Sequence, residues 1–187
     1  MERFFEYITH LCFLSEESKE MLAKVLQPTE VKKGHELLRP GSICHNLYFI
    51  EEGLTRTWYL KDGKDVTDWI SAENSFAVSL ISFITRQPDR RGIEALEPSK
   101  LWSISYYDLE NLYKVSHEIE RLGRLLISHG IVQVQQRFDD LHFYTARERY
   151  EKLVKEHPSL INRVPVGMIA SFLGISRETL SRIRSAL

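Results

Sequence analysis

Three charged side chains near the end of the chain have the chemistry to read the edges of nucleic-acid bases. The stretch IASFLGISRETLSRIR, residues 169–184, places Arg177, Glu178 and Arg182 on one short amphipathic segment. An arginine can donate two hydrogen bonds to guanine O6 and N7, and a glutamate can accept one from cytosine N4. Hydroxyls at the start of the segment can bond phosphate oxygens and fix the register. The candidate nucleic-acid contacts are Ser176, Arg177, Glu178, Thr179, Ser181 and Arg182.

Two short helices are expected to position these side chains. The first begins near Pro165, since proline suits the first turn of a helix, and ends at Gly174. Ser176 then caps the second helix. The pattern predicts a helix-turn-helix, and the alternative is a helical hairpin whose arginines are ordinary solvated charges. The residues expected to face inward are Ala170, Leu180 and Ile183.

The balanced net charge of the chain conceals a basic C-terminal part. The 187 residues carry a formal charge of −1, yet residues 144–187 hold 8 Lys and Arg against 4 Asp and Glu. At 43% hydrophobic residues the chain can bury a core, and no run of apolar residues is long enough to cross a membrane. The acidic N-terminus lacks the basic region of a signal peptide, so we expect a cytoplasmic protein with no membrane partner. Cys12 and Cys44 are expected to be free thiols.

The N-terminal half of the chain changes from helical to strand-like patterning. Apolar residues recur at three- and four-residue intervals over residues 2–26, with a second helix start at Ser15. From Thr29 to about Ser105, short strands alternate with turn residues. The clearest hairpin is LTRTWYLKDGKDVTDWI, whose Asp62-Gly63 pair suits a two-residue turn. These features predict a small antiparallel sandwich or barrel flanked by helices.

A long helix is expected from about Ser116 to Phe143. At 1.5 Å per residue it would span roughly 40 Å, which is more than a small barrel can cover. Part of its apolar stripe should therefore pack on a second copy of the same helix. The alternative is a solitary helix that packs only on its own domain. A further amphipathic helix is expected over residues 145–157, followed by SLINRV as a linker.

The chain resembles the Crp/Fnr family of bacterial transcription regulators over essentially its whole length, most strongly at GISRETLSRIR. The resemblance implies an α+β fold: an antiparallel, cyclic-nucleotide-binding-like β-roll (jelly roll) over residues 1–115, a dimerisation helix over 116–143 and an all-α helix-turn-helix domain over 144–187. It also implies a homodimer on an inverted repeat of double-stranded DNA related to TGTGA, with RNA polymerase as a partner. Leu187 directly follows the recognition helix, so the β-wing of the family's winged helix is expected to be missing or truncated.

The expected ligand site departs from the family's pattern. Cyclic-nucleotide binders carry a G-E-x-x-L motif and a later R-S/T-A motif, whereas this chain has FAVSLISFITRQPDRRGIEAL. The Gly-Glu pair is absent, so cAMP is not the expected effector. Two alternatives remain for the site: it binds an unknown anionic ligand through an arginine, or it binds no ligand. In the second case, Arg90 and Arg91 would be a solvated pair in a loop. The candidate ligand contacts are Ser79, Leu80, Arg90 and Arg91.

Two other classes of protein compete with a regulator. A cupin-like metal enzyme would need an HxH pair, and none of the seven histidines forms one. The sequence has no cysteine cluster and no haem motif, so we expect the protein to carry no cofactor. It also has no GxSxG nucleophile motif, and we do not expect it to be an enzyme. The other alternative is a ligand-sensing β-roll interaction protein whose tail does not bind DNA.

Overall fold

Two four-stranded antiparallel sheets make up the middle of the chain, within residues 1–186, which are the residues that the computed structural model describes. The strand orders are β1-β8-β3-β6 and β2-β7-β4-β5. The antiparallel, strand-rich region predicted from the sequence is confirmed. The strands are β1 (Gln27–Val31), β2 (Glu36–Leu38), β3 (Asn46–Glu52), β4 (Thr55–Lys61), β5 (Lys64–Ser71), β6 (Phe76–Ala77), β7 (Gly92–Ala95) and β8 (Ser99–Ser105).

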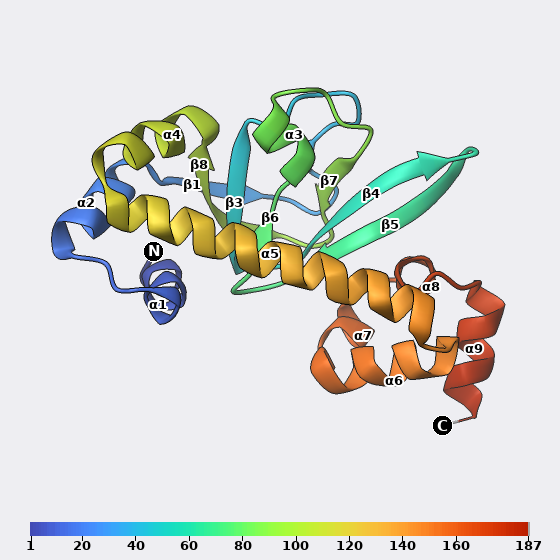
Figure 1. Cartoon of the computed structure of the whole chain (residues 1–187). Helices are drawn as coiled ribbons and strands as arrows, with labels where there is room; N and C mark the ends of the chain where they lie inside the picture. Colours follow the sequence, from blue (N-terminus) through green and yellow to red (C-terminus); the bar gives the residue numbers. More distant parts are fainter. Residues whose placement is uncertain (187) are drawn as a thin grey trace.

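Helices precede, interrupt and follow the sheets, which confirms the mixed α+β class (Figure 1). One short helix lies between β6 and β7, and the remaining helices come before β1 or after β8. The helices are α1 (Glu2–Leu11), α2 (Glu16–Val25), α3 (Leu80–Thr85), α4 (Tyr106–Val115), α5 (His117–Phe143), α6 (Ala146–Glu156), α7 (Leu160–Arg163), α8 (Val166–Phe172) and α9 (Arg177–Ser185).

The first two helices close one end of the sheets. Ser15 caps α2 as predicted, because its side chain accepts a hydrogen bond from the Ser18 amide. The apolar faces of α1 and α2 pack with β3, β8, α4 and the start of α5 in one core. Its most deeply buried members include Ile8, Leu22 and Phe49.

The predicted hairpin is formed by β4 and β5. Asp62 and Gly63 have φ values of 52° and 73°, so both turn residues lie in the left-handed region that a tight two-residue turn requires. The burial along β4 does not alternate, however, since Leu54 and the next three residues are all buried. The reason is tertiary: α8 packs against β5, and Leu54 joins the core of the C-terminal helices.

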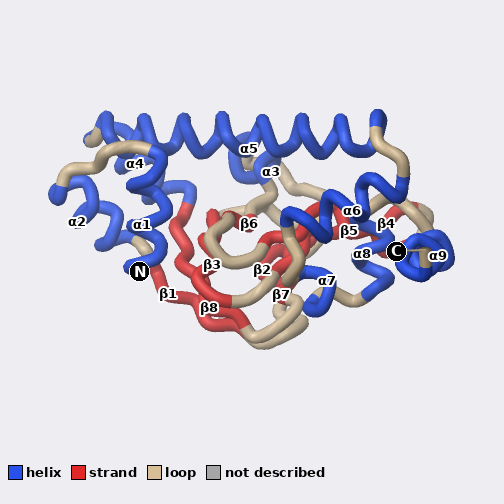
Figure 2. Tube along the Cα trace, turned by 90° about the horizontal axis from the view of Figure 1, so that it is seen from below, coloured by secondary structure: helices blue, strands red, loops and turns tan. Residues whose placement is uncertain are grey.

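Helix α5 runs along the length of the molecule, from α4 to the C-terminal helices, with the sheets on one side of it (Figures 1 and 2). Ser116 caps it and it ends at Phe143, close to the predicted bounds. Its first third is anchored, because Ile119 and Leu122 are buried in the N-terminal core. Farther along, its apolar side chains are exposed.

Helices α6 to α9 form a C-terminal helical unit with its own core, which also includes Leu54, just before β4, and Leu96, just after β7. The prediction that SLINRV is only a linker is wrong, because Leu160–Arg163 forms the short helix α7. Leu160 is 5% exposed and packs in this core, which favours a helical turn over an extended linker. The prediction about the β-wing concerns Leu187, which lies outside the described residues.

Cys12 and Cys44 are free and buried, as expected. Within residues 1–186, no helix has the length and apolar character that crossing a membrane would demand.

Candidate functional site

Helix α9 presents the charged trio that the sequence singled out. Ser176 caps the helix, its side chain accepting a hydrogen bond from the Thr179 amide, and Leu180 is 0% exposed. With that face held inward, Arg177, Glu178 and Arg182 are exposed. Ser176 and Ser181 are also exposed, and Thr179 is half-buried. All six residues proposed from the sequence therefore lie on this capped helix or at its start.

The carboxylate of Glu178 is held in its charged form. Hydrogen bonding with Ser176 lowers the pKa of Glu178 first, followed by the backbone amide and the nearby guanidinium groups of Arg177 and Arg182. An ionised glutamate can only accept hydrogen bonds. The trio thus offers one acceptor between two multiple donors.

The turn between α8 and α9 brings the two helices into contact. Gly174 has a φ of 68°, which lets the chain reverse after Leu173, and Ala170 is 1% exposed where the helices pack. Sequence reasoning missed Gly167. A Cβ at that position would lie 2.4 Å from Nε of Arg177, so the absence of a side chain there lets the Arg177 guanidinium lie across α8.

The third arginine of the segment faces its own protein. Arg184 is half-buried, its Nε donates to the hydroxyl of Tyr150 over 3.2 Å, and its guanidinium lies 5.6 Å from the centre of that ring. Arg184 is not one of the candidate nucleic-acid contacts, and it has a hydrogen-bond partner within the protein. The residue lies on the face of α9 that packs on α6, which makes it a structural contact.

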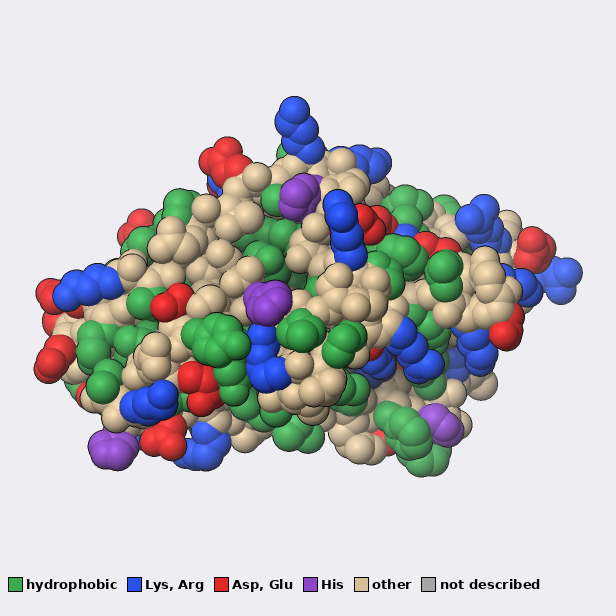
Figure 3. Space-filling view, turned by 90° about the horizontal axis from the view of Figure 1, so that it is seen from above, with side chains coloured by type: hydrophobic (Ala, Val, Ile, Leu, Met, Phe, Trp, Pro, Cys, Tyr) green, Lys and Arg blue, Asp and Glu red, His purple; other side chains and the backbone are tan. Residues whose placement is uncertain are grey.

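A row of exposed apolar side chains follows α5 beyond its anchored part. Figure 3 shows hydrophobic side chains interspersed with charged ones on the side that carries α3 and α4. Along α5, the exposed apolar side chains recur at alternating intervals of four and three residues, which is the spacing of a coiled-coil seam. This α5 seam consists of Ile127, Ile131, Val134, Phe138 and Leu141, with exposed fractions between 39% and 58%.

A cavity of about 1080 Å³ lies between the sheets and α5, and its lining extends from α1 to α8. Ile127, Ile131 and Val134 of the α5 seam also line it. Three of the four candidate ligand residues, Ser79, Leu80 and Arg91, line it. Arg90 is exposed, and its guanidinium lies 5.2 Å from the centre of the Tyr59 ring, outside this lining. Sequence reasoning missed two acidic residues of the same cavity, Asp68 and Asp89, because no motif marks them.

The acidic residues bind the arginine of the cavity. Arg91 donates from Nε to Asp68 over 2.7 Å and from Nη1 to Asp89 over 3.3 Å. Asp89 is 8% exposed and also accepts from the Ser79 hydroxyl over 2.5 Å. Burial by itself would raise the pKa of Asp89, but hydrogen bonds from Ser79 and Arg91 lower it. We refer to Asp68, Asp89 and Arg91 as the pocket-floor cluster.

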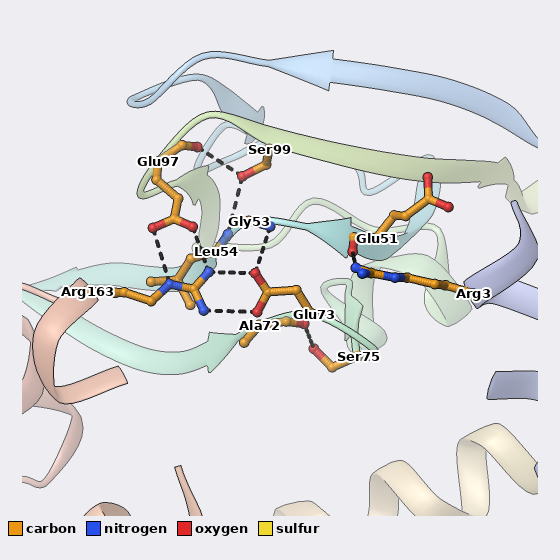
Figure 4. Close-up of polar contacts among 10 residues, drawn as sticks. All are labelled: Arg3, Glu51, Gly53, Leu54, Ala72, Glu73, Ser75, Glu97, Ser99 and Arg163. Atoms are coloured by element: carbon orange, nitrogen blue, oxygen red, sulfur yellow. Dashed lines mark hydrogen bonds and ion pairs between the residues drawn. The ribbon is translucent and has the colours of Figure 1, made fainter. Parts of the chain in front are cut away.

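The C-terminal helical unit is attached to the sheets by an arginine between two glutamates (Figure 4). Arg163 of α7 donates to both oxygens of Glu73 over 2.7 and 2.9 Å, and to Glu97 over 2.6 Å. One Glu73 oxygen also accepts from the Gly53 amide over 3.0 Å. These contacts link α7 to the segments that follow β5 and β7.

Acidification is expected to weaken this attachment. Burial would raise the pKa of Glu73, but hydrogen bonds from Arg163, its own amide and Gly53 lower it to about 2, against 4.5 for a free glutamate. Because the folded-state pKa is depressed, the stabilisation is complete above pH 4.5 and is lost as the pH falls toward 2. Glu73→Gln should lower the free energy of unfolding by about 1 to 2 kcal/mol at pH 7 and flatten its dependence on pH below 4.5.

Urea unfolding at pH 7 and pH 3 measures this effect. Glu52→Gln is the matched control, because Glu52 pairs with Lys100 on the surface and is 54% exposed. Equal losses of stability in the two variants would contradict a specific role for Glu73.

Within residues 1–186, no group of three or more His, Cys, Asp or Glu side chains is arranged to hold a metal ion.

Comparison with known proteins identifies the class of the two-sheet domain. Residues 28–116 match the family model of the cyclic nucleotide-binding domain, which covers the sheets, α3 and α4. No curated protein sequence matches the chain.

Solved structures share the fold of nearly the whole chain and include Crp/Fnr regulators. A putative Crp/Fnr regulator of Eubacterium rectale superposes with a TM-score of 0.70 at 21% identity, over 91% of this chain and 82% of that one. The catabolite activator protein of Thermus thermophilus superposes with a TM-score of 0.60 at 19% identity, over 97% of this chain and 86% of that one. The c-di-GMP-responsive regulator CLP of Xanthomonas campestris superposes with a TM-score of 0.71 at 17% identity, over 92% of this chain and 91% of that one.

Proposed function

We propose that this protein is a homodimeric transcription regulator of the Crp/Fnr type that binds an inverted-repeat DNA site through a helix-turn-helix formed by α8 and α9. The observation that carries the proposal is the exposed Arg177, Glu178 and Arg182 trio on a helix whose Leu180 is completely buried. A helix of this size fits the major groove, where base edges distinguish all four base pairs. The structural neighbours named as Crp/Fnr regulators support the same function.

The six candidate contacts divide into the trio, which specifies bases, and three hydroxyl side chains, which fix position. Arg177 and Arg182 donate to guanine O6 and N7, and Glu178 accepts from the amino group of cytosine. Ser176, Thr179 and Ser181 bond phosphate oxygens, assisted by the positive end of the helix dipole. Arg184, which bonds Tyr150, takes no part in reading bases.

The α5 seam supports a two-fold dimer. The exposed row extends over 15 residues, from Ile127 to Leu141, and pairing it with a second copy removes its side chains from water. A symmetric dimer presents two α9 helices, and these reach successive major grooves when they are about 34 Å apart. The DNA site is accordingly an inverted repeat.

An effector in the cavity would act on this dimer through α5, which forms one wall of the cavity and carries the seam. Two conformations of the dimer that differ in the spacing of the α9 helices would differ in DNA affinity. We infer a sensor of this type and no catalytic role. cAMP is not the proposed ligand, because Asp68 and Asp89 already hold Arg91.

Binding to random-sequence duplexes tests the proposal. Selection should recover an inverted repeat, and the affinity for it should fall steeply between 50 and 200 mM salt, since each phosphate contact releases counterions. A protein that fails to bind any duplex at low salt would instead be a ligand-sensing interaction protein without DNA binding.

A further inference from the structure

Within residues 1–186, the cations that line the cavity already have hydrogen-bond partners in the protein. Four Arg and Lys residues line the cavity: Arg91, Arg137, Arg149 and Lys152. Arg91 is bound by two carboxylates, Lys152 donates to Asp140 over 2.8 Å, and Arg149 donates to the carbonyl oxygens of Tyr144 and Leu173. Arg137 donates to the carbonyl oxygen of Phe172.

The charge balance of the cavity also opposes an anion. Six carboxylates line it against these four cations: Asp68, Glu73, Asp89, Glu110, Asp140 and Glu156. Arg163, from outside the lining, holds Glu73, so five carboxylates remain against the four cations. A phosphate group beside Arg91 would face Asp68 and Asp89 and would have to displace one of these carboxylates. The aromatic and aliphatic side chains of the lining, among them Trp69, Phe76 and Leu126, can instead cover an uncharged molecule.

Asp68 occupies a special position in the backbone of β5. Thr57 pairs with Trp69 and Trp58 pairs with Thr67, so Asp68 is the extra residue of a β-bulge. A bulge redirects one side chain and leaves its backbone outside the regular ladder. Here it directs the Asp68 carboxylate to Arg91.

The residue next to the bulge is bonded to the C-terminal helical unit. The amide of Thr67 donates to the hydroxyl of Ser171 on α8 over 2.9 Å. The next residue of α8, Phe172, contacts α5: the guanidinium of Arg137 lies 3.9 Å from the centre of its ring. Asp68 of the pocket-floor cluster is therefore adjacent in β5 to Thr67, which contacts α8 directly.

We propose that Asp68 closes the cavity to phosphate-bearing ligands, reserves it for an uncharged, largely apolar ligand, and couples the occupancy of Arg91 to α8 through the β5 bulge. When Asp68 leaves Arg91, the bulge shifts and the bond between Thr67 and Ser171 weakens. The coupling to α8 deepens the proposed function, because α8 supports the helix that reads DNA. The ligand selectivity and the contact with Ser171 are properties of the protein without DNA.

Calorimetric titration of the full-length protein tests the selectivity. The probes are cAMP and N-phenyl-1-naphthylamine, which is uncharged and apolar. The wild-type protein should bind the naphthylamine and bind cAMP only with a dissociation constant of about 1 mM or weaker. Asp68→Asn should gain affinity for cAMP by about ten-fold or more, because Arg91 is released from one carboxylate. Adding Arg91→Gln to Asp68→Asn should abolish that gain. Micromolar binding of cAMP by the wild-type protein, or failure to bind the naphthylamine, would overturn the proposed selectivity.

Hydrogen exchange of the amide of Thr67 tests the coupling, also without DNA. Asp68→Asn should accelerate this exchange by about five-fold or more relative to the wild type, since a single hydrogen bond to Ser171 protects the amide. Asp62→Asn is the matched control, because Asp62 lies at the exposed turn of the same hairpin and Asn also adopts a positive φ there. Equal acceleration in both variants would show a general weakening of the hairpin and would overturn the coupling. Neither result depends on whether the protein binds DNA.

Discussion

Replacing Ile131 and Val134 together with Asp should convert the protein to monomers and weaken its binding to an inverted repeat by about 100-fold or more. Both side chains lie in the middle of the α5 seam, where they are 58% exposed in the single chain. In the dimer they would be desolvated against the partner helix, so four unpaired carboxylates at the interface strongly oppose association. Loss of the dimer also removes the second half-site contact, and with it the gain from bivalent binding.

Sedimentation velocity measures the oligomeric state, and titration of a duplex measures the affinity. Val132→Asp is the control, because Val132 is 52% exposed on the same helix but is rotated by about 100° from Ile131. It should remain a dimer and bind DNA normally. If the double variant sediments as a dimer, the seam is not the interface.

Replacing Arg177 or Arg182 with Ala should cost about 1 to 3 kcal/mol in binding to the selected site and relax the preference at one base pair. The reason is that each exposed guanidinium can bond a guanine bidentately, and Ala leaves the base edge without a partner.

Competition with duplexes altered at single positions separates the two kinds of contact. Equal weakening on all sequences would mean that the arginines bind phosphates rather than bases. Arg184→Ala is the matched control. It removes the contact with Tyr150 and should lower the stability of the C-terminal helical unit while leaving base preference unchanged.

Local sequence signals were sufficient for the turn between β4 and β5, the start of α9 and the inward face of α9. Asp62-Gly63 specified a hairpin turn because few residues adopt two successive positive φ values, and Ser176 specified a helix start because its hydroxyl can accept from a free amide. The inward position of Leu180 followed from helical periodicity. The α7 helix was missed because four residues carry too little periodic signal to distinguish a helix from a linker.

The chemistry of the cavity could not be predicted in the same way. Arg91 was a candidate ligand contact from sequence, but its binding by Asp68 and Asp89 depends on side chains that different strands and loops bring together. The bulge that turns Asp68 toward the cavity depends on how β4 and β5 pair. Likewise, Arg163 is one of many basic residues in the sequence until folding places it between Glu73 and Glu97.

The succession of N-terminal helices, strands, long helix and C-terminal helices, the trio on α9 and the apolar spacing along α5 were all predictable, because they follow from the conformational preferences and periodicity of neighbouring residues. Which charges are exposed and which are paired within the protein depends instead on how the chain folds. Arg177 and Arg182 stay exposed while Arg91, Arg163 and Arg184 are bound within the protein, since the pairing of a charge depends on residues that are distant in the chain and close in space.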